Sequence, residues 1–251
     1  MGNYYLNQYL TMFWLKKLKK NLFFLILGSF LISFTSSSVS KISLSMEMKT
    51  LRNKKYVKAL TDVFYDYSND KIVMHYTYPF EQMIFTNKFG ETKIYNPKNN
   101  TVFITQDQSN STQGTFIYHF LAKKIQDMGL KDLGFKLKDT KFENQYMVTR
   151  WVPPLEMADK IGSIKLVHKD YLPVFMEYKD NKLSTLKKTY YTDYKSYTDI
   201  NIPMKITDIN FFGDKDSSIT RVTINNVNLS PNSSFFNYTI PTNAKNISGK
   251  K

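Results

Sequence analysis

The chain has 251 residues, a formal net charge of +14 and no cysteine. Without cysteine, disulfide frameworks and thiol chemistry are excluded, so the fold must be stabilised by burial alone, for which the chain is long enough. Its basic charge and 16% aromatic residues would favour a nucleic-acid surface in the cytosol, but the first residues point to export.

Residues 1–40 have the pattern of a secretory signal sequence. Four lysines at positions 16, 17, 19 and 20 precede an uncharged apolar run at 22–34, and a serine-rich stretch follows at 36–40. The apolar run is shorter than the roughly 20 residues of a membrane span, so an uncleaved anchor is the weaker alternative. We expect cleavage near Ser40, with Met12 as an alternative start. No cysteine follows the run to carry a lipid, which predicts an unanchored periplasmic protein.

The exported part would keep a charge of about +10 once the four lysines of the signal sequence are removed. Outside the cytosol this charge favours anionic membrane surfaces or acidic partners over nucleic acid. The next segment, residues 41–60, mixes lysines with scattered apolar residues. It is compatible with an edge strand or a short amphipathic helix, and we favour the strand.

Residues 62–97 have the clearest strand pattern. Large apolar or aromatic side chains alternate from 72 to 78, which is the period of a strand, and Pro79 ends it. Further strands are expected at 81–86, 91–95 and 102–105, with turns at 87–90 and 96–97. This predicts an antiparallel meander. Its inward side is expected to be aromatic and, at Met74 and Met83, adaptable.

The hydrophobic period changes at residues 115–128. Apolar residues recur there at intervals of three and four, with Lys123, Lys124 and Asp127 on the other side, which predicts an amphipathic helix. After residue 143 strands return, at 146–151, 161–168, 172–178, 184–194, 204–212 and 219–227. About ten strands and one helix indicate a mainly β protein. We expect one domain at 41–248, an incomplete antiparallel barrel with a helical lid over an apolar cavity, and a disordered tail at 249–251.

Several short motifs, in this order, resemble the outer-membrane lipoprotein carrier (LolA-like) family. They are Tyr78-Pro79, Gly90, Tyr95, Pro97, Phe120-Leu121, Ile202-Pro203 with Ile206, and Phe236 to Pro241, after a signal sequence without a lipidation cysteine. The resemblance covers about Leu44 to Pro241. Two features depart from it: residues 41–60 make a poor version of the family's opening amphipathic helix, and residues 68–77 lack the arginine that contacts the lid.

The resemblance implies a carrier that shields the acyl chains of lipoproteins between the inner and outer membranes. Its partners would be acylated lipoproteins or free lipid, an inner-membrane lipoprotein-releasing ABC transporter and an outer-membrane acceptor, and we expect a monomer. Expected cavity residues are Met74, Tyr76, Tyr78, Met83, Phe85, Met176, Tyr178, Ile206, Val222 and Ile224. The expected lid residues are Phe116, Phe120, Leu121 and Ile125.

No catalytic or metal-binding pattern accompanies these motifs. His75, His119 and His168 are isolated from other ligand residues, and no nucleophile elbow, zinc-protease or phosphate-loop motif occurs. We therefore expect no enzyme activity, cofactor, metal or nucleic acid. Three alternatives remain at this point: a carrier of free lipid or glycolipid on the same fold, a protein-binding β-domain of the envelope that is filled by its own side chains, and a secreted hydrolase whose catalytic residues form no recognised motif.

Overall fold

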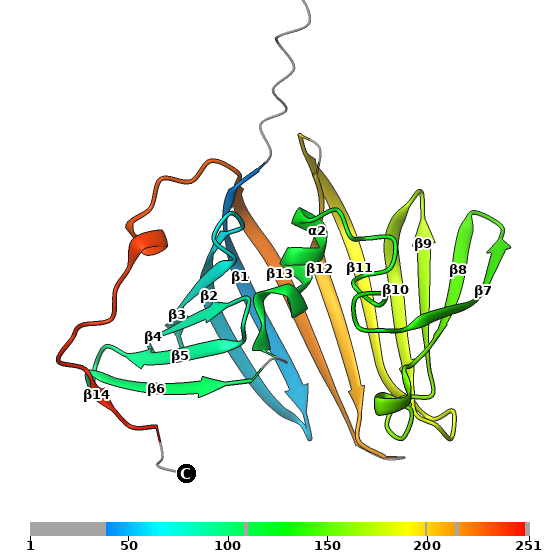
Figure 1. Ribbon diagram of the computed structural model, residues 1–251, viewed down its shortest axis with the longest axis horizontal. Coiled ribbons are helices and arrows are strands. Elements are labelled where there is room, and N and C mark those ends of the chain that lie inside the picture. The colour runs from blue at the N-terminus through cyan, green and yellow to red at the C-terminus, as the bar shows by residue number, and fades with distance from the viewer. Residues whose placement is uncertain (1–38, 108–109, 199, 214–215, 249–251) are drawn as a thin grey trace, which may run out of the picture. The chain divides into compact units, whose positions relative to one another are not determined.

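The computed structural model describes residues 39–107, 110–198, 200–213 and 216–248. The expected signal sequence, except for Val39 and Ser40, and the tail at 249–251 lie outside these residues. The described residues form one open sheet with very little helix (Figure 1). The mainly β, open architecture predicted from the sequence is therefore confirmed.

The sheet has fourteen strands, more than the ten expected. They are β1 (Lys41–Arg52), β2 (Lys55–Asp66), β3 (Lys71–Tyr78), β4 (Gln82–Asn87), β5 (Glu91–Asn96), β6 (Thr101–Gln106), β7 (Lys136–Glu143), β8 (Tyr146–Val152), β9 (Ser163–Lys169), β10 (Leu172–Lys179), β11 (Thr185–Tyr197), β12 (Ile200–Phe211), β13 (Ser217–Asn228) and β14 (Lys245–Asn246). Their spatial order is β14-β6-β5-β4-β3-β2-β1-β13-β12-β11-β10-β9-β8-β7, and every neighbouring pair is antiparallel except β14 with β6.

The segment expected as an edge strand forms the centre of the sheet. It holds all of β1 and the first half of β2, joined by a two-residue turn at Asn53 and Lys54. β1 also pairs with β13, from the far end of the chain. This pairing joins two meanders into one sheet. β13 follows β1 by about 175 residues, so the local sequence pattern does not reveal that the two strands pair.

The two faces of the sheet are covered by different parts of the chain. We call the face on which helix α2 (Phe116–Leu121) packs the concave face, since the sheet curves around that helix (Figure 1). Alternation places Ile42, Leu44 and Met46 of β1 on this face, all buried. The main hydrophobic core lies here, between the sheet and the chain that joins β6 to β7.

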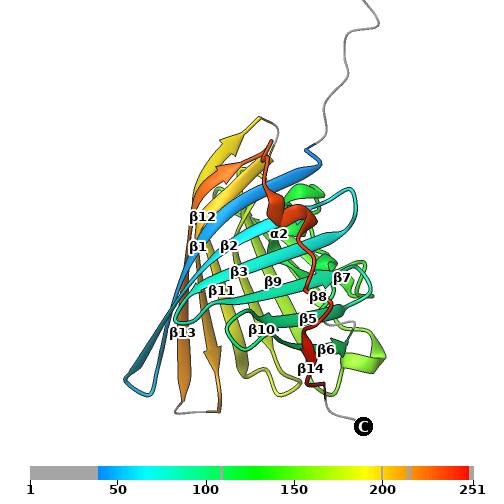
Figure 2. The same cartoon turned by 90° about the vertical axis from the view of Figure 1, so that its left-hand side faces the viewer.

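The opposite, outer face of β2 to β6 is covered by the C-terminal strap, which we define as residues 233–246. The strap includes the 3-10 turn η4 (Ser234–Asn237) and β14. Phe235 of the strap stacks on Phe64 of β2 with ring centroids 4.8 Å apart, and Tyr238 stacks on Phe85 of β4 at 5.8 Å. Figure 2 shows the strap crossing these strands.

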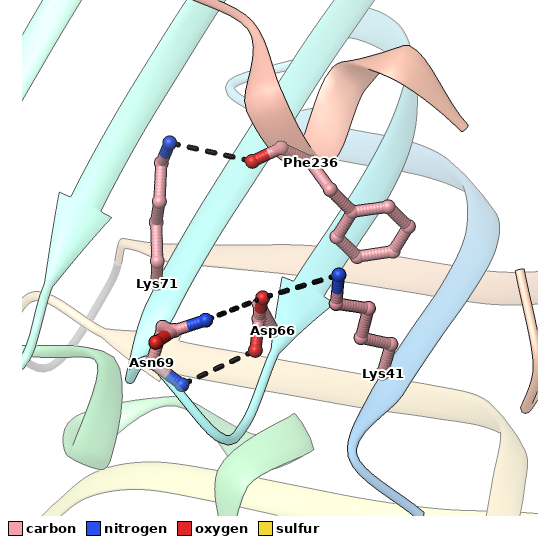
Figure 3. Close-up of polar contacts among 5 residues, drawn as sticks. All are labelled: Lys41, Asp66, Asn69, Lys71 and Phe236. Atoms are coloured by element: carbon pink, nitrogen blue, oxygen red, sulfur yellow. Dashed lines mark hydrogen bonds and ion pairs between the residues drawn. The ribbon is translucent and has the colours of Figure 1, made fainter. Parts of the chain in front are cut away.

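A polar cluster fixes η4 of the strap to the beginning of β1 and to the turn between β2 and β3 (Figure 3). The Asp66 carboxylate accepts hydrogen bonds from the backbone and side-chain nitrogens of Asn69, and lies 3.5 Å from Lys41 Nζ. The same Lys41 ammonium lies 5.0 Å from the centroid of the Phe236 ring, while Lys71 Nζ donates to the Phe236 carbonyl at 3.4 Å. Because Asp66 is buried, this cluster ties strap, β1 and the β2–β3 turn together.

We call residues 111–135, between β6 and β7, the insert. It begins with the 3-10 turn η2 (Thr112–Gly114), whereas the turn η3 (Leu155–Met157) lies elsewhere, after β8. The helix expected at 115–128 exists only as α2, where the Thr115 hydroxyl accepts from the Tyr118 backbone N–H. α2 stops because Lys123 takes a left-handed conformation, with φ of 55°. Turns then carry the chain to β7.

Candidate functional site

The concave face presents apolar side chains from strands on both halves of the sheet. β1, β2 and β3 supply one wall, which includes Val63, Tyr65 and Ile72. The other wall comes from β8 to β13, and its buried members are Trp151, Ile164, Leu166, Met176, Tyr191, Ile200, Ile202, Met204, Ile206 and Ile224. This face is continuous, apolar and rich in methionine and tyrosine.

The insert fills the space between these walls. Its buried apolar side chains are Ile117, Tyr118, Phe120, Leu121, Met128, Leu130 and Phe135. The Phe120 ring packs against both Tyr191 and Tyr194, each at a centroid distance of 6.2 Å. Between α2 and the residues Ile42, Leu44 and Ile202 there remains a void of only about 10 Å³. Beneath α2, the described residues thus leave no open apolar cavity of the kind expected from the sequence, because the insert's own side chains occupy this space.

Two histidines support the insert. His168 of β9 is 1% exposed, and its Nε2 donates to the Ile125 carbonyl of the insert at 2.8 Å. The His119 ring lies directly against Gly129, which has a φ of 77° and leaves no space there for a side chain. Burial lowers the pKa of both imidazoles, and for His119 the Asp127 carboxylate opposes this while Lys124 adds to it. Both Nδ1 atoms are buried without a hydrogen-bond partner among the described residues.

Two tyrosine hydroxyls on the concave face have partners within the sheet. The Tyr194 hydroxyl donates to the Pro173 carbonyl at 2.5 Å, and the Tyr178 hydroxyl donates to the Met176 sulfur at 3.4 Å. Burial raises the pKa of Tyr178 to about 12 and raises the pKa of Tyr191 and of Tyr194 further. These tyrosines therefore stay neutral, and their rings act as apolar wall.

The register of the sheet divides the predicted cavity residues between the two faces. Six of them lie in the core of the concave face with all four predicted lid residues: Met74, Met176, Tyr178, Ile206, Val222 and Ile224, with Phe116, Phe120, Leu121 and Ile125. Tyr76 shares their face, since it alternates with His75 and follows Met74 by two residues. Tyr78 is 48% exposed, near the end of β3.

Met83 and Phe85 lie on the outer face, contrary to the inward position expected for them. Phe85 is paired with Val73, and Met83 with His75, and paired residues point to the same side of a sheet. Both are buried beneath the C-terminal strap. The period-two pattern alone does not tell which of two apolar phases faces the interior, because here both faces of β4 are covered.

Sequence reasoning missed the wall residues of β1, together with Tyr65, Tyr191 and Trp151. Ile42, Leu44 and Met46 do alternate with serines and a lysine, which is a strand signal. A stricter count of that alternation would have found them. Trp151 and Tyr191 stand in strands that were predicted correctly, but nothing local marks the face on which they point.

The outer face of β7 to β11 carries a groove of about 750 Å³. Apolar side chains such as Val167 and Phe175 form part of its lining, but six charged residues of both signs stand among them: Lys141, Glu143, Arg150, Lys165, Glu177 and Lys179. Glu177 is buried and lies 3.4 Å from Lys165 Nζ. This groove thus mixes apolar side chains with charged side chains of both signs, unlike the concave face.

Comparison with solved structures identifies the architecture. A LolA superfamily protein from Nitrosomonas europaea superposes with a TM-score of 0.54 at 10% identity, over 78% of this chain and 88% of the other. A domain from Vibrio parahaemolyticus, provisionally described as an outer membrane lipoprotein-sorting protein, gives 0.54 at 16% identity, over 76% and 86% of the two chains. The chain has a LolA-like fold.

A third neighbour is a DUF1329 family protein from Desulfovibrio piger, with a TM-score of 0.55 at 12% identity over 80% of this chain and 90% of the other. None of these three descriptions names an enzyme. No protein-family model and no curated protein matches the chain.

The LolA-like sheet offers no assembled metal site. Within the described residues, no group of three or more histidine, aspartate or glutamate side chains is placed to hold an ion. The helices of this part of the chain are also too short or too polar for a membrane span.

Proposed function

We propose that the protein carries lipid acyl chains on its concave face, and that its cargo is a lipoprotein shielded between the inner and outer membranes. The observation that carries this proposal is the construction of the site. A broad apolar face of a LolA-like sheet is covered by a short irregular insert, whose contacts an acyl chain could replace. Most of the expected wall residues, including Met176, Ile206 and Ile224, lie on that face.

The free energies of the two occupants are similar in size. A side chain of this kind gains about 1.5–3 kcal/mol on burial, so the seven buried apolar side chains of the insert contribute on the order of 10–20 kcal/mol together. An acyl chain of about sixteen carbons gains roughly 12 kcal/mol at about 0.8 kcal/mol per methylene. Cargo and insert can therefore exchange without a large net change, which suits a carrier that must also release its load.

The insert is suited to act as a lid. α2 has only six residues, far below the length at which an isolated helix is stable in water, so its packing on the sheet holds it in place. We propose that the insert leaves the concave face when an acyl chain enters and returns when it is delivered. Residues 68–77 lack the arginine that would contact the lid. In this scheme the insert is held instead by contacts such as Phe120 with Tyr191 and His168 with the Ile125 carbonyl.

In this proposal the protein works in the periplasm after removal of the signal sequence. It would receive cargo from a lipoprotein-releasing ABC transporter and pass it to an outer-membrane acceptor, as a monomer and without a cofactor or catalytic step. A free lipid or glycolipid would fit the same face, because the walls recognise the acyl chain and carry no group specific for a polypeptide.

One observation favours a different candidate. The void of about 10 Å³ beneath α2 is far below the roughly 300 Å³ of the smallest common ligand sites, as expected for an envelope β-domain that binds proteins and never opens. The two candidates make opposite predictions about acyl chains.

Native mass spectrometry of protein purified from a periplasm decides between them. Co-purifying acylated peptide supports lipoprotein transport, and bound phospholipid alone supports a free-lipid carrier. A clean apo mass, together with no uptake of a fluorescent fatty acid, would contradict both carrier functions and leave the protein-binding domain. The variant Tyr76→Asp places a charge on the concave face and should abolish uptake with an unchanged circular dichroism spectrum. Uptake equal to that of the parent would show that this face is not the site.

A further inference from the structure

The long β1–β2 hairpin ends in a tip, residues 49–58, whose β1 edge pairs with β13 as far as Arg52. Residues 51–57 are exposed without interruption. Figure 2 shows the hairpin reaching its turn at the lower left, beside the lower ends of β12 and β13. Asn53 and Lys54 both have positive φ, 49° and 61°, as in the tight two-residue turns that match the twist of paired strands. Strand pairing continues to Arg52 and Lys55 within the hairpin and to Arg52 and Ser218 with β13, so the tip is stiff.

Large apolar side chains are exposed on both sides of this tip. Leu51 is 47% exposed and pairs with Tyr56, which is 58% exposed. Val57, also 58% exposed, is on the other side, opposite Thr50. Phe212, at the turn after β12, is 47% exposed and lies beneath Arg52, with 4.1 Å between the guanidinium carbon and the ring centroid. Exposed aliphatic and aromatic groups concentrated at one end of a hairpin are a mark of an interaction surface.

The tip is also strongly basic. Its ten residues contain five lysine or arginine side chains and no acidic one. Glu47 pairs with Lys49 and with Lys58, and Asp216 lies 2.7 Å from Arg52. Lys54 and Lys55, at the very end, have no ion pair with any described residue. Two ammonium groups without an ion-pair partner in the described part of the chain therefore stand beside Leu51, Tyr56 and Val57.

We propose that this tip docks on the surface of an anionic lipid bilayer. Lysines at the end would meet the headgroup phosphates, while the tyrosine ring and the aliphatic side chains enter the interface, where aromatic rings are favoured. Both requirements of peripheral membrane binding, apolar side chains and cations, are met within one hairpin. An acidic protein would satisfy the lysines, but it would not require exposed apolar groups on both faces of the hairpin. The bilayer is therefore the occupant that the observations favour.

This surface is separate from the concave face, and its function does not depend on acyl-chain carriage. Along β1, the last buried residue of the concave face is Met46, whereas the tip begins at Lys49. Vesicle binding is measured without any fatty acid. A failure of the docking proposal would thus leave the carrier function untouched, and the reverse also holds.

Co-sedimentation with vesicles tests the proposal. The probe is a set of vesicles of phosphatidylcholine with and without phosphatidylglycerol, at low and high salt. The parent protein should bind only the vesicles that contain phosphatidylglycerol, and less at high salt because screening weakens the attraction. The pair Lys54→Glu and Lys55→Glu should reduce partition by on the order of 100-fold. The pair Leu51→Ser and Tyr56→Ser should reduce it by roughly tenfold at unchanged charge.

A matched control separates the tip from the overall charge. Lys136 and Lys138 are exposed on β7, at the far end of the strand order, and the change of both to Glu alters net charge by the same amount. This control should bind within about twofold of the parent. The proposal would be overturned by equal losses in the two charge-reversal variants, by unchanged binding after the removal of Leu51 and Tyr56, or by a parent protein that does not bind. Capture of an acidic protein without vesicle binding would also overturn it.

A single label reports the insertion directly. Because the chain has no cysteine, Tyr56→Cys can carry one environment-sensitive fluorophore. Its emission should shift to the blue on addition of anionic vesicles, whereas the same label at Lys138→Cys should not respond. A response of both labels, or of neither, would contradict docking through the tip.

Discussion

The substitution Phe120→Ala tests whether the insert and an acyl chain compete for one face. Phe120 is 3% exposed, and its ring packs against Tyr191 and Tyr194 of β11. Buried Phe→Ala changes cost about 3–5 kcal/mol, and we expect 2–3 kcal/mol here because a short insert relaxes more easily than a strand. If the insert must leave before an acyl chain enters, the weaker packing of the insert lowers the free energy needed to open the site. The acyl chain then binds more tightly by the same amount. The variant should therefore bind a fluorescent fatty acid roughly 30- to 100-fold more tightly.

The matched control is Phe85→Ala, which makes the same change on the outer face. Phe85 is similarly buried, at 8% exposure, and stacks on Tyr238 of the C-terminal strap. It should lower the free energy of unfolding, measured by urea titration, without tightening fatty-acid binding. The reasoning is refuted if Phe120→Ala destabilises the protein and leaves binding unchanged or weaker, because Phe120 would then be ordinary core.

Three further predictions concern the supports of the insert and the strap. Burial lowers the pKa of His119 and His168 in the folded state, so the unfolded chain binds more protons below the ordinary pKa of about 6.5, and stability should fall as the pH drops through that value. Thermal unfolding across this range measures the loss, and His168→Gln should flatten it; a profile that rises toward acid would contradict the assignment. Gly129→Ala should cost about 1–3 kcal/mol and increase fatty-acid uptake, since the left-handed backbone and the His119 ring leave no place for a methyl group. Asp66→Asn should cost about 1–2 kcal/mol and speed proteolysis of the strap with uptake unchanged, and a change in uptake would show that strap and insert are coupled.

Local patterns predicted most of the strands because each leaves its own trace in the sequence. Alternation located β3 to β6 and β8 to β13 within a few residues. β7 escaped because both of its faces are exposed, so it has no buried side to generate an alternating pattern. The helix was predicted too long, since Lys123 ends α2 in a conformation that usually takes glycine and gives no stop signal.

The sequence predicted which segments form the candidate site, but not the face of the sheet on which each side chain lies. The apolar periodicity of the insert correctly brought Phe120 and Leu121 to the core. Met83 and Phe85 were assigned to the wrong face because the strap, which covers them, arrives from 150 residues later in the chain. The filling of the hollow was also beyond sequence reasoning, since it depends on how closely insert and walls fit.

Hydrogen exchange at the insert tests the central claim most directly. Amide exchange is followed by mass spectrometry with and without a saturating fatty acid, comparing α2 with the wall strand β12. The account predicts that α2 loses protection when the fatty acid is bound, while β12 keeps or gains it. If α2 stays protected while fatty acid is demonstrably bound, the acyl chain lies elsewhere and the insert is not its lid.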